Sequence, residues 1–435
     1  MLFRSVGMKS QEIAINGKSV INVVMQEETV SLDEVVAVGY GTQKKVNLTG
    51  AVSQVTAKQL ENRPISSVTQ MLQGTIPNVS VNVGSGSPGT TGSINIRGLG
   101  SINSNSPLIL IDGIPGSMES LDPAQVKSIS VLKDASSAAI YGARAAFGVV
   151  LITTKDADSK KIEVSYNGYA AFSQPTVSTD FITNGYEYAS LYDRSRFGRN
   201  GTSNSVTSYT EEDYAELEAR RYDKTENPDR PWVVVKNGKY NYYGNVDWWK
   251  WMYKEWMPSQ SHSISVSGGN EKVKSVLTAT FYQKEGLIKR VDEKYQTFNI
   301  SSKVSVKVNN WININNHLQY FDRVHSYPGE DASNAAFART TLYCAPMYVP
   351  IGPDGNYTGL MKSGKILAEG RVANLYGGVS KGQDGLRNFK ETFSFDLTPL
   401  KDLIIKADYT YMFSMDDDWK RQGLVYVSNG TPDRK

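Results

Sequence analysis

Long stretches of the chain after residue 160 alternate strictly between apolar and polar side chains. In residues 296–308 the even positions include Phe298 and Ile300, whereas the odd positions are all Thr, Asn, Ser or Lys. Successive side chains of a β-strand point to opposite faces, so this period of two predicts strands with one apolar face. The same period returns in residues 312–320, 392–397 and 403–411. A soluble β-sandwich also alternates, so the pattern predicts strands without deciding what surrounds them.

The connections between these strands alternate in length. Seven strands are predicted, near residues 162–172, 260–268, 273–283, 295–308, 311–323, 388–397 and 403–413. The connections after the second, fourth and sixth strands are short, and those after the first, third and fifth are longer. Short turns on one side and long loops on the other are typical of an outer-membrane β-barrel. Soluble domains rarely carry structureless connections as long as those after the first and fifth strands.

Residues 46–157 have a different pattern of predicted secondary structure, in which short helices and strands follow one another closely. Asp122-Pro123 predicts a helix start, with Asp as N-cap and Pro at the first helical position. Asp134 is expected to cap a second helix over residues 135–141, which Gly142 would end. Strands are predicted at residues 79–83, 94–97, 108–111, 129–132 and 149–154. Residues 46–157 therefore read as a compact α+β domain.

The N-terminal part divides into two short segments. In residues 1–31, strand-like runs at 12–15 and 20–25 flank an Asn16-Gly17 turn, which predicts a hairpin at the end of a small β-domain. Residues 32–45 contain a short apolar strand. An acidic pair precedes this strand, and a Gly-rich segment that ends in basic residues follows it.

Composition excludes several classes of protein. The 47 Lys and Arg nearly balance the 44 Asp and Glu, so no nucleic-acid partner is expected. The single cysteine, Cys344, cannot form an internal disulfide. No run reaches the roughly 20 apolar residues that a spanning helix needs, but barrel strands need no such run. The 25 Tyr and 7 Trp fit a barrel, which places these rings at the membrane interfaces.

No catalytic or metal-binding constellation is evident, so we expect neither an enzyme nor a cofactor. The Gly-rich segment 84–92 lacks the Lys and Ser/Thr of a P-loop, and three scattered His give no zinc spacing. Residues 416–418 are three Asp, for which a solvated loop is the preferred interpretation and a calcium site the alternative. For the aromatic cluster 248–253, a loop helix or an interface girdle is favoured over a surface that stacks on a sugar ring.

Three ordered blocks, residues 95–103, 107–115 and 126–155, resemble the plug domain of TonB-dependent receptors, specifically of the SusC/RagA branch. The run 33–41, Asp-Glu-Val-Val-Ala-Val-Gly-Tyr-Gly, is similar to that branch's Ton box and linker. Trp248, residues 263–270 and Glu285-Gly286 resemble the family's early barrel, so the resemblance covers essentially the whole chain. The chain departs from the family pattern at Phe147, usually a small polar residue, and at Ala37, more often Val.

The resemblance implies four regions. Residues 1–31 are expected to end a carboxypeptidase-regulatory-like domain, 32–45 to be the Ton box and linker, 46–157 the plug, and 158–435 the first part of the barrel. Since a barrel that encloses a plug has about 22 strands, the expected fold is an α+β plug followed by a partial, truncated antiparallel transmembrane β-barrel. The expected TonB-binding residues are Asp33, Glu34, Val35, Val36, Ala37 and Val38. An extended segment of this kind can add as a strand to another sheet, although an ordinary strand of the preceding domain is the alternative.

The residues that carry the plug resemblance are expected to be structural. Gly142 and Gly148 would permit turns, and Asp112 is expected to form a turn rather than to act as a catalytic acid. Arg97 and Arg144 would either pair with carboxylates in the barrel lumen or stay solvated. The full set of signature residues is Arg97, Gly98, Asp112, Gly113, Lys133, Asp134, Tyr141, Gly142, Arg144 and Gly148.

The function that the resemblance implies is import of a bulky nutrient, an oligosaccharide or a peptide, across the cell outer membrane. The expected partners are outer-membrane lipid, TonB with its inner-membrane energising complex, and a SusD-like lipoprotein on the loops of 173–260 and 324–387. A signal-transducing receptor and a soluble carbohydrate-binding β-protein are the alternatives. The residues that bind the substrate are not identified by the sequence.

Overall fold

The computed structural model describes residues 2–3, 11–12, 23, 35–38, 41–44, 52–56, 67–83, 86–90, 92–96, 106–156, 161–176, 178–200, 207–328, 343–359, 361, 367, 371–401 and 403–432. Two compact units make up the chain. The first unit consists of residues 1–82 and 92–155, and the second of residues 83–91 and 156–435.

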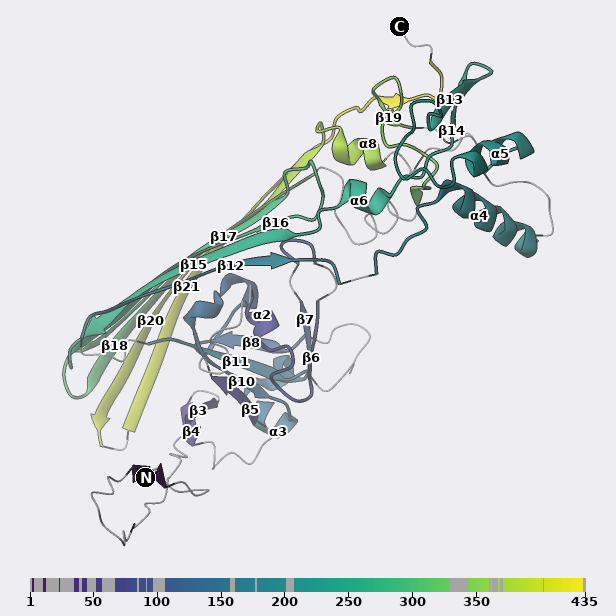
Figure 1. The fold of residues 1–435 in the computed structure, drawn as a ribbon. Coiled ribbons are helices and arrows are strands. Elements are labelled where there is room, and N and C mark those ends of the chain that lie inside the picture. The colour runs from purple at the N-terminus through teal and green to yellow at the C-terminus, as the bar shows by residue number, and fades with distance from the viewer. Residues whose placement is uncertain are drawn as a thin grey trace, which may run out of the picture. The chain divides into compact units, whose positions relative to one another are not determined.

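A five-stranded sheet is the centre of the first unit (Figure 1). Its strands, in spatial order, are β5 (Val52–Thr56), β10 (Val126–Leu132), β11 (Val149–Thr154), β8 (Leu108–Ile111) and β9 (Ile114–Pro115). Strands β11 and β8 are parallel, and the other neighbours are antiparallel. The strands predicted at 108–111 and 149–154 are confirmed to the residue, and the one predicted at 129–132 begins earlier, at Val126.

Both faces of this sheet are buried, because the apolar runs of its central strands contribute to two separate cores. The core on one face contains Ile129, Val131, Val150 and Ile152, together with residues of α2 (Val68–Met71). The core on the other face contains Leu132, Val149 and Leu151, together with Ala138 and Ala145. A strand buried on both faces reads as a continuous apolar run rather than an alternating one.

The helical segments of the first unit are mostly 3-10 turns rather than α-helices. Asp122 caps a helix as expected, but this helix is the 3-10 turn η3 (Pro123–Gln125), and it follows a similar turn, η2 (Met118–Ser120). The helix predicted at 135–141 is α3 (Ala135–Ala138) continued by the 3-10 segment η4 (Ala139–Ala145). Gly142, with non-helical φ 64° and ψ −151°, separates two helical turns within η4, so the first helix ends at this glycine as predicted.

Three two-stranded hairpins complete the first unit. Strands β6 (Val79–Asn82) and β7 (Ser93–Ile96) confirm the strands predicted at 79–83 and 94–97. β3 (Val35–Val38) pairs with β4 (Gly41–Lys44). Strand β1 (Leu2–Phe3) pairs with β2 (Gln11–Glu12), whereas most of the hairpin predicted over residues 12–25 lies outside the described residues.

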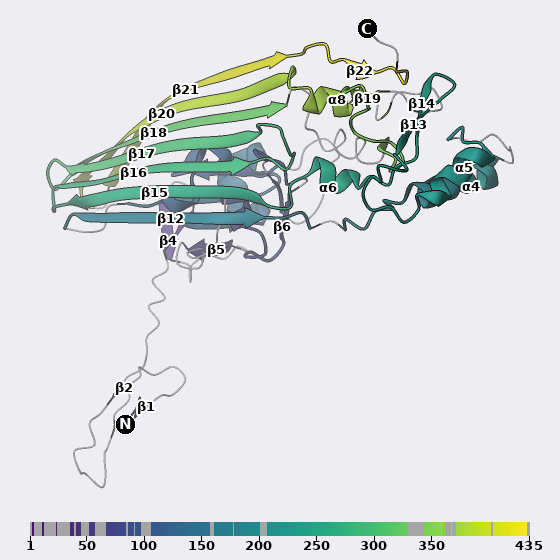
Figure 2. The same ribbon diagram turned by 45° about the horizontal axis from the view of Figure 1, so that its top comes forward.

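The second unit contains one antiparallel sheet of seven strands, side by side in chain order (Figure 2). The strands are β12 (Glu163–Ser173), β15 (Met257–Gly269), β16 (Val273–Glu285), β17 (Lys294–Lys307), β18 (Ile312–Pro328), β20 (Lys381–Leu400) and β21 (Leu403–Arg421). All seven predicted strands are therefore found. The short connections 270–272, 308–311 and 401–402 alternate with the long ones 174–256, 286–293 and 329–380, as predicted.

The last three strands extend further toward the long connections than their alternation predicts. Pro328 pairs with Lys381, and Lys381 pairs with Arg421. Residues 416–418 therefore lie in β21, opposite 384–386, and the preferred interpretation of a solvated loop is wrong. Main-chain pairing continued where the side-chain pattern had ended, because ladder hydrogen bonds do not require apolar side chains. No group of acidic, His or Cys residues that could hold a metal occurs among the described residues.

The central strands β16 and β17 contain buried polar and exposed apolar side chains, the reverse of the pattern in a soluble protein. On β16 and β17, the polar cross-strand neighbours Thr280 and Asn299 are 2% and 4% exposed. The apolar side chains Leu277 and Phe298, on the opposite face of the same strands, are 48% and 39% exposed. In water such a contiguous apolar face carries a large hydrophobic penalty, but in hydrocarbon it carries none. The sheet therefore has the surface of a transmembrane β-barrel wall.

Over the part of the chain that the structure describes, no helix is both long and apolar enough to span a membrane.

A charge on the exposed apolar face should impair membrane assembly. We expect Leu277→Arg in the complete protein to destabilise the membrane-inserted state by about 1 to 4 kcal/mol, because the guanidinium would lie against lipid. The measurement is the fraction of protein recovered from outer membranes as a folded, heat-modifiable species. Leu277→Met, which keeps the face apolar, is the matched control. Equal recovery of both variants would contradict the assignment of this face to lipid.

Candidate functional site

The segment expected to bind TonB forms one strand of a small hairpin. Val35, Val36, Ala37 and Val38 make up β3, and each pairs with a residue of β4, from Val35 with Lys44 to Val38 with Gly41. Asp33 and Glu34 lie outside the described residues. The segment is thus already extended, which is the conformation that strand addition requires.

The Asp112-Gly113 turn between β8 and β9 forms as predicted, and the Asp112 side chain has a structural role. Both residues have positive φ, 50° and 85°. The Asp112 carboxylate accepts hydrogen bonds from the backbone N–H of Thr154, at 2.9 Å, and from its Oγ1, at 2.7 Å. Since Thr154 ends β11, this contact fixes the turn to the end of the neighbouring parallel strand. Asp112 is therefore a turn residue, as expected.

The other described signature residues also act on local structure. The Lys133 Nζ donates to the carbonyl of Pro77 at 2.7 Å, and the Asp134 carboxylate caps α3 through the N–H of Ser137 at 2.8 Å. Gly148 has φ 92°, and a Cβ there would lie 2.8 Å from the Ile96 side chain, so only glycine fits. Tyr141 is half-buried and Arg144 is exposed, whereas Arg97 and Gly98 lie outside the described residues.

The long connections of the second unit fold on a shared apolar core, here called the loop core. The connection after β12 contributes α4 (Gly185–Asn200), α5 (Glu211–Ala219), β13 (Val233–Lys236), β14 (Lys239–Tyr242) and α6 (Trp248–Met252). The connection after β18 contributes β19 (Tyr357–Thr358) and α8 (Arg371–Tyr376), and β22 (Val427–Ser428) follows β21. The expectation of structureless loops is wrong. Buried residues of the loop core include Tyr209, Leu217, Tyr242, Tyr243, Trp248, Met252, Ile288, Met347, Tyr348 and Tyr376.

Hydrogen bonds join loop segments that are far apart in the sequence. The Trp248 Nε1 donates to the carbonyl of Ala345 at 3.0 Å, and the Tyr376 hydroxyl donates to the carbonyl of Met252 at 2.7 Å. β19 pairs in parallel with β22. The connections therefore support one another as one folded body.

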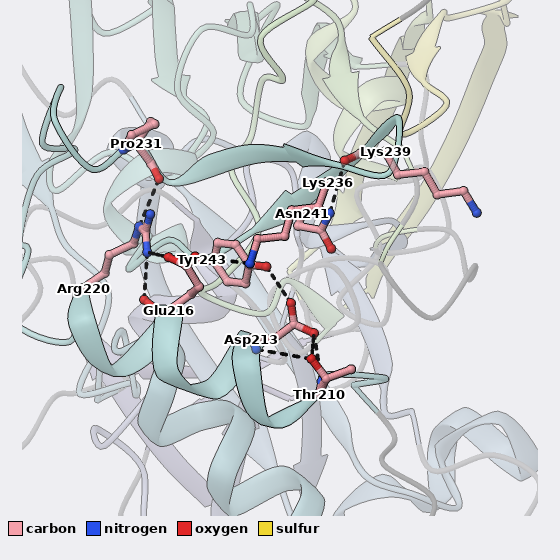
Figure 3. Close-up of polar contacts among 9 residues, drawn as sticks. All are labelled: Thr210, Asp213, Glu216, Arg220, Pro231, Lys236, Lys239, Asn241 and Tyr243. Atoms are coloured by element: carbon pink, nitrogen blue, oxygen red, sulfur yellow. Dashed lines mark hydrogen bonds and ion pairs between the residues drawn. The ribbon is translucent and has the colours of Figure 1, made fainter.

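A buried carboxylate attaches α5 to this body. Asp213 is 2% exposed and closes a capping box with Thr210, and its Oδ1 accepts a hydrogen bond of 2.5 Å from the Tyr243 hydroxyl (Figure 3). Hydrogen bonds to a buried carboxylate offset the cost of removing it from water. Helix α5 was missed in the sequence, although Thr210 three residues before Asp213 is a recognisable start signal.

A buried arginine completes the attachment. Arg220, 4% exposed, donates from Nε to the carbonyl of Pro231 at 3.0 Å and from Nη1 to Glu216 at 2.6 Å (Figure 3). Its guanidinium lies 5.3 Å from the centre of the Tyr243 ring. Hydrogen bonds from Arg220, followed by those from Lys236, lower the pKa of the Glu216 carboxyl. Asp213, Arg220 and Glu216 thus have structural contacts here rather than a catalytic arrangement.

The aromatic cluster at 248–253 includes the short helix α6, which confirms the favoured loop-helix interpretation. Trp248 and Met252 are buried in the loop core, Trp249 packs on Tyr253 with ring centres 4.6 Å apart, and Trp251 packs on Tyr376 at 4.7 Å. These rings contact protein. The aromatic side chains of α6 therefore pack against the loop core.

Alkaline pH should loosen the loop core. Burial is the largest cause that raises the pKa of Tyr209, Tyr243 and Tyr376 above the ordinary value of 10.0, and it raises that of Tyr242 to about 12. Because the unfolded tyrosines would ionise first, their contribution to stability is complete below pH 10 and is lost as pH rises toward the folded-state pKa.

The measurement is protease cleavage of the loops in the complete protein from about pH 9 to about pH 12. Cleavage should rise steeply above pH 10. Tyr243→Phe should cost about 1 to 3 kcal/mol at neutral pH, because it leaves one oxygen of Asp213 without its donor. Loops that stay resistant throughout, in the wild type and in Tyr243→Phe alike, would contradict the account.

Comparison with known proteins agrees with both units. Residues 44–149 match the TonB-dependent Receptor Plug Domain. The chain is 30% identical to TonB-dependent receptor P26 of Formosa agariphila over 99% of its own length and 40% of the relative's. It is 38% identical to TonB-dependent receptor SusC of Bacteroides thetaiotaomicron over 42% of its own length and 19% of that protein.

A solved structure has the same fold. The RagAB peptide importer in its open-open state matches with a TM-score of 0.66 at 24% identity, over 88% of this chain and 43% of that one. The chain thus spans 40% of the length of the curated relative P26. The chain belongs to the SusC/RagA branch of the TonB-dependent receptors of the cell outer membrane, and it carries the plug domain followed by antiparallel strands of the barrel.

Proposed function

We propose that the complete protein imports a bulky nutrient, an oligosaccharide or a peptide, across the outer membrane in a TonB-dependent step. The observation that carries this proposal is the combination of a plug domain with a sheet whose apolar face is exposed and whose polar face is buried. Such a sheet suits a membrane wall around a polar lumen, and the plug is a small domain with two apolar cores of its own. Relatives named as TonB-dependent receptors support the TonB-dependent step, and a structural neighbour named as a peptide importer supports a bulky cargo such as a peptide.

Each successive region of the chain has its own proposed role. Residues 1–31 end a carboxypeptidase-regulatory-like domain, 32–45 are the Ton box and linker, 46–157 the plug, and 158–435 the first part of the barrel. The boundary between the two compact units, at residues 155 and 156, supports the end proposed for the plug. TonB, driven by its inner-membrane energising complex, adds a strand to residues 33–38 and pulls, so that the plug rearranges and cargo passes. No covalent chemistry is required of the chain.

The strand β3 suits this role because only one of its edges is occupied among the described residues. Its partner β4 fills one edge of a two-stranded sheet, which leaves the main-chain groups of the other edge available for a further strand. Several main-chain hydrogen bonds loaded together can transmit a pull along the chain.

A SusD-like lipoprotein is the proposed partner at the long-connection side. The loop core offers it a preformed support, and several large apolar side chains remain exposed there. Leu191 and Phe197 on α4 are 51% and 57% exposed, and Trp256 is 48% exposed. Aromatic side chains of this kind are enriched in protein interfaces.

Deletion of residues 33–38 should abolish uptake and leave cargo binding nearly unchanged. The reason is that this segment couples energy and takes no part in the loops that would meet the cargo. Uptake of labelled cargo by cells and binding to the purified protein are measured side by side. An equally long deletion of residues 26–31 is the control. Full uptake after loss of 33–38 would refute the proposed TonB contact.

The lipoprotein proposal predicts a stable complex. Affinity purification of the complete protein from native membranes in mild detergent should recover one lipoprotein at about equal stoichiometry, because wide loops present exposed aromatic side chains. An importer that purifies alone, and still binds cargo as well as it does in the membrane, would show that the loop core closes the entrance by itself.

A further inference from the structure

A segment that connects two plug strands belongs structurally with the barrel sheet. Residues 83–91 link β6 to β7, which form a hairpin of the first unit, yet they group with the second unit. The described part of this segment, residues 86–90, lies against the ends of β16 and β17. The Lys284 Nζ on β16 donates a hydrogen bond of 3.0 Å to the carbonyl of Gly86.

The second contact is steric. Gly89 has φ 77°, and a Cβ there would lie 2.8 Å from two atoms of the Tyr295 ring. Backbone conformation and space both require glycine at this position, so the backbone lies directly on the ring. Tyr295 is the cross-strand partner of Lys284, so both side chains lie on one face of the sheet.

A buried carboxylate is close enough to attract Lys284. Glu293, just before β17, is 3% exposed, and its carboxylate attracts the Lys284 ammonium. Among the described residues this carboxylate accepts no hydrogen bond, and the His325 Nε2 lies 3.5 Å from its Oε1. A buried carboxylate without hydrogen bonds depends on nearby positive charge. Lys284 is therefore attracted by both the carbonyl of Gly86 and the charge of Glu293.

The chain is tied to the same sheet where it leaves the plug. The Lys303 Nζ, on β17, lies 3.0 Å from the Asp156 carboxylate, and the Lys303 side chain is 16% exposed. The register pairs Val276 with Lys303 and Lys284 with Tyr295, and the even spacing within each strand puts both lysines on the same face. Two lysines of adjacent strands thus contact Gly86 and Asp156. Both of these residues lie soon after a point at which the chain leaves the first unit.

We propose that residues 86–90 are a fixed part of the barrel wall, with Lys284 and Tyr295 as the positioning residues, and that they stay on the wall while the rest of the plug rearranges. This inference rests on the proposed import function. The plug must then move about points on either side of residues 86–90. A pull on residues 33–38 is carried along the chain as far as this anchor and is resisted there.

A reversible cross-link tests whether the segment stays on the wall. In the complete importer, Cys344, the sole cysteine, is replaced by Ala, and Gly86→Cys is combined with Lys284→Cys. A short bifunctional thiosulfonate then bridges the pair, and uptake is measured before bridging, after it, and after reduction. The anchor predicts uptake within about twofold of the unbridged protein. Uptake that is lost on bridging and returns on reduction would overturn it.

Hydrogen exchange provides a second measurement that needs no transport. In the purified complete protein, the amides of residues 86, 87, 89 and 90 should exchange slowly, and Lys284→Met should speed their exchange at least tenfold. Lys274→Met, on the same strand but exposed, should leave the rate unchanged. Equal exchange in both variants would refute the anchor even in a protein that transports. Survival of uptake after deletion of 33–38 would refute the proposed function and leave this exchange test standing.

Discussion

The structure depends on one constraint, that a sheet in hydrocarbon must show apolar side chains outward and leave no main-chain group unpaired. Strands β16 and β17 satisfy it strand by strand, since Phe281 pairs with Phe298 on the exposed face and Thr280 with Asn299 on the buried one. A slip of one residue in register would exchange the two faces. The strict alternation of the sequence therefore fixes both the pairing and the side that meets lipid.

The long connections meet a different requirement. A polypeptide of this length outside a sheet must satisfy its own polar groups, and here it does so by building a core from several connections. Tyr243 shows how closely the parts depend on each other, because its hydroxyl holds Asp213 of α5 while its ring lies beneath the Arg220 guanidinium. The result is a folded body on the side of the long connections, which gives the proposed lipoprotein a preformed surface to bind.

The sequence predicted the strands well because their signal is local. Period-two alternation fixed all seven, whereas the polar ends of β20 and β21 were missed because the pairing of Asp384 with Asp418 is made by the main chain and leaves no apolar pattern. The plug motifs were recognisable, but the roles of Asp112 and Lys133 needed the fold, since their partners Thr154 and Pro77 are distant in the chain. The loop core could not be predicted for the same reason, because Trp248 and Ala345 are distant in the chain and come into contact only after folding.

The central claim is that the exposed apolar face of the sheet contacts lipid and that the polar face does not. Spin labels placed singly at 277, 280, 298 and 299 of the complete protein in bilayers test it through their accessibility to molecular oxygen, which concentrates in hydrocarbon, and to a polar nickel reagent. The account predicts high oxygen accessibility at 277 and 298 and low oxygen accessibility at 280 and 299. The reverse order, or nickel accessibility at 277 and 298, would contradict it.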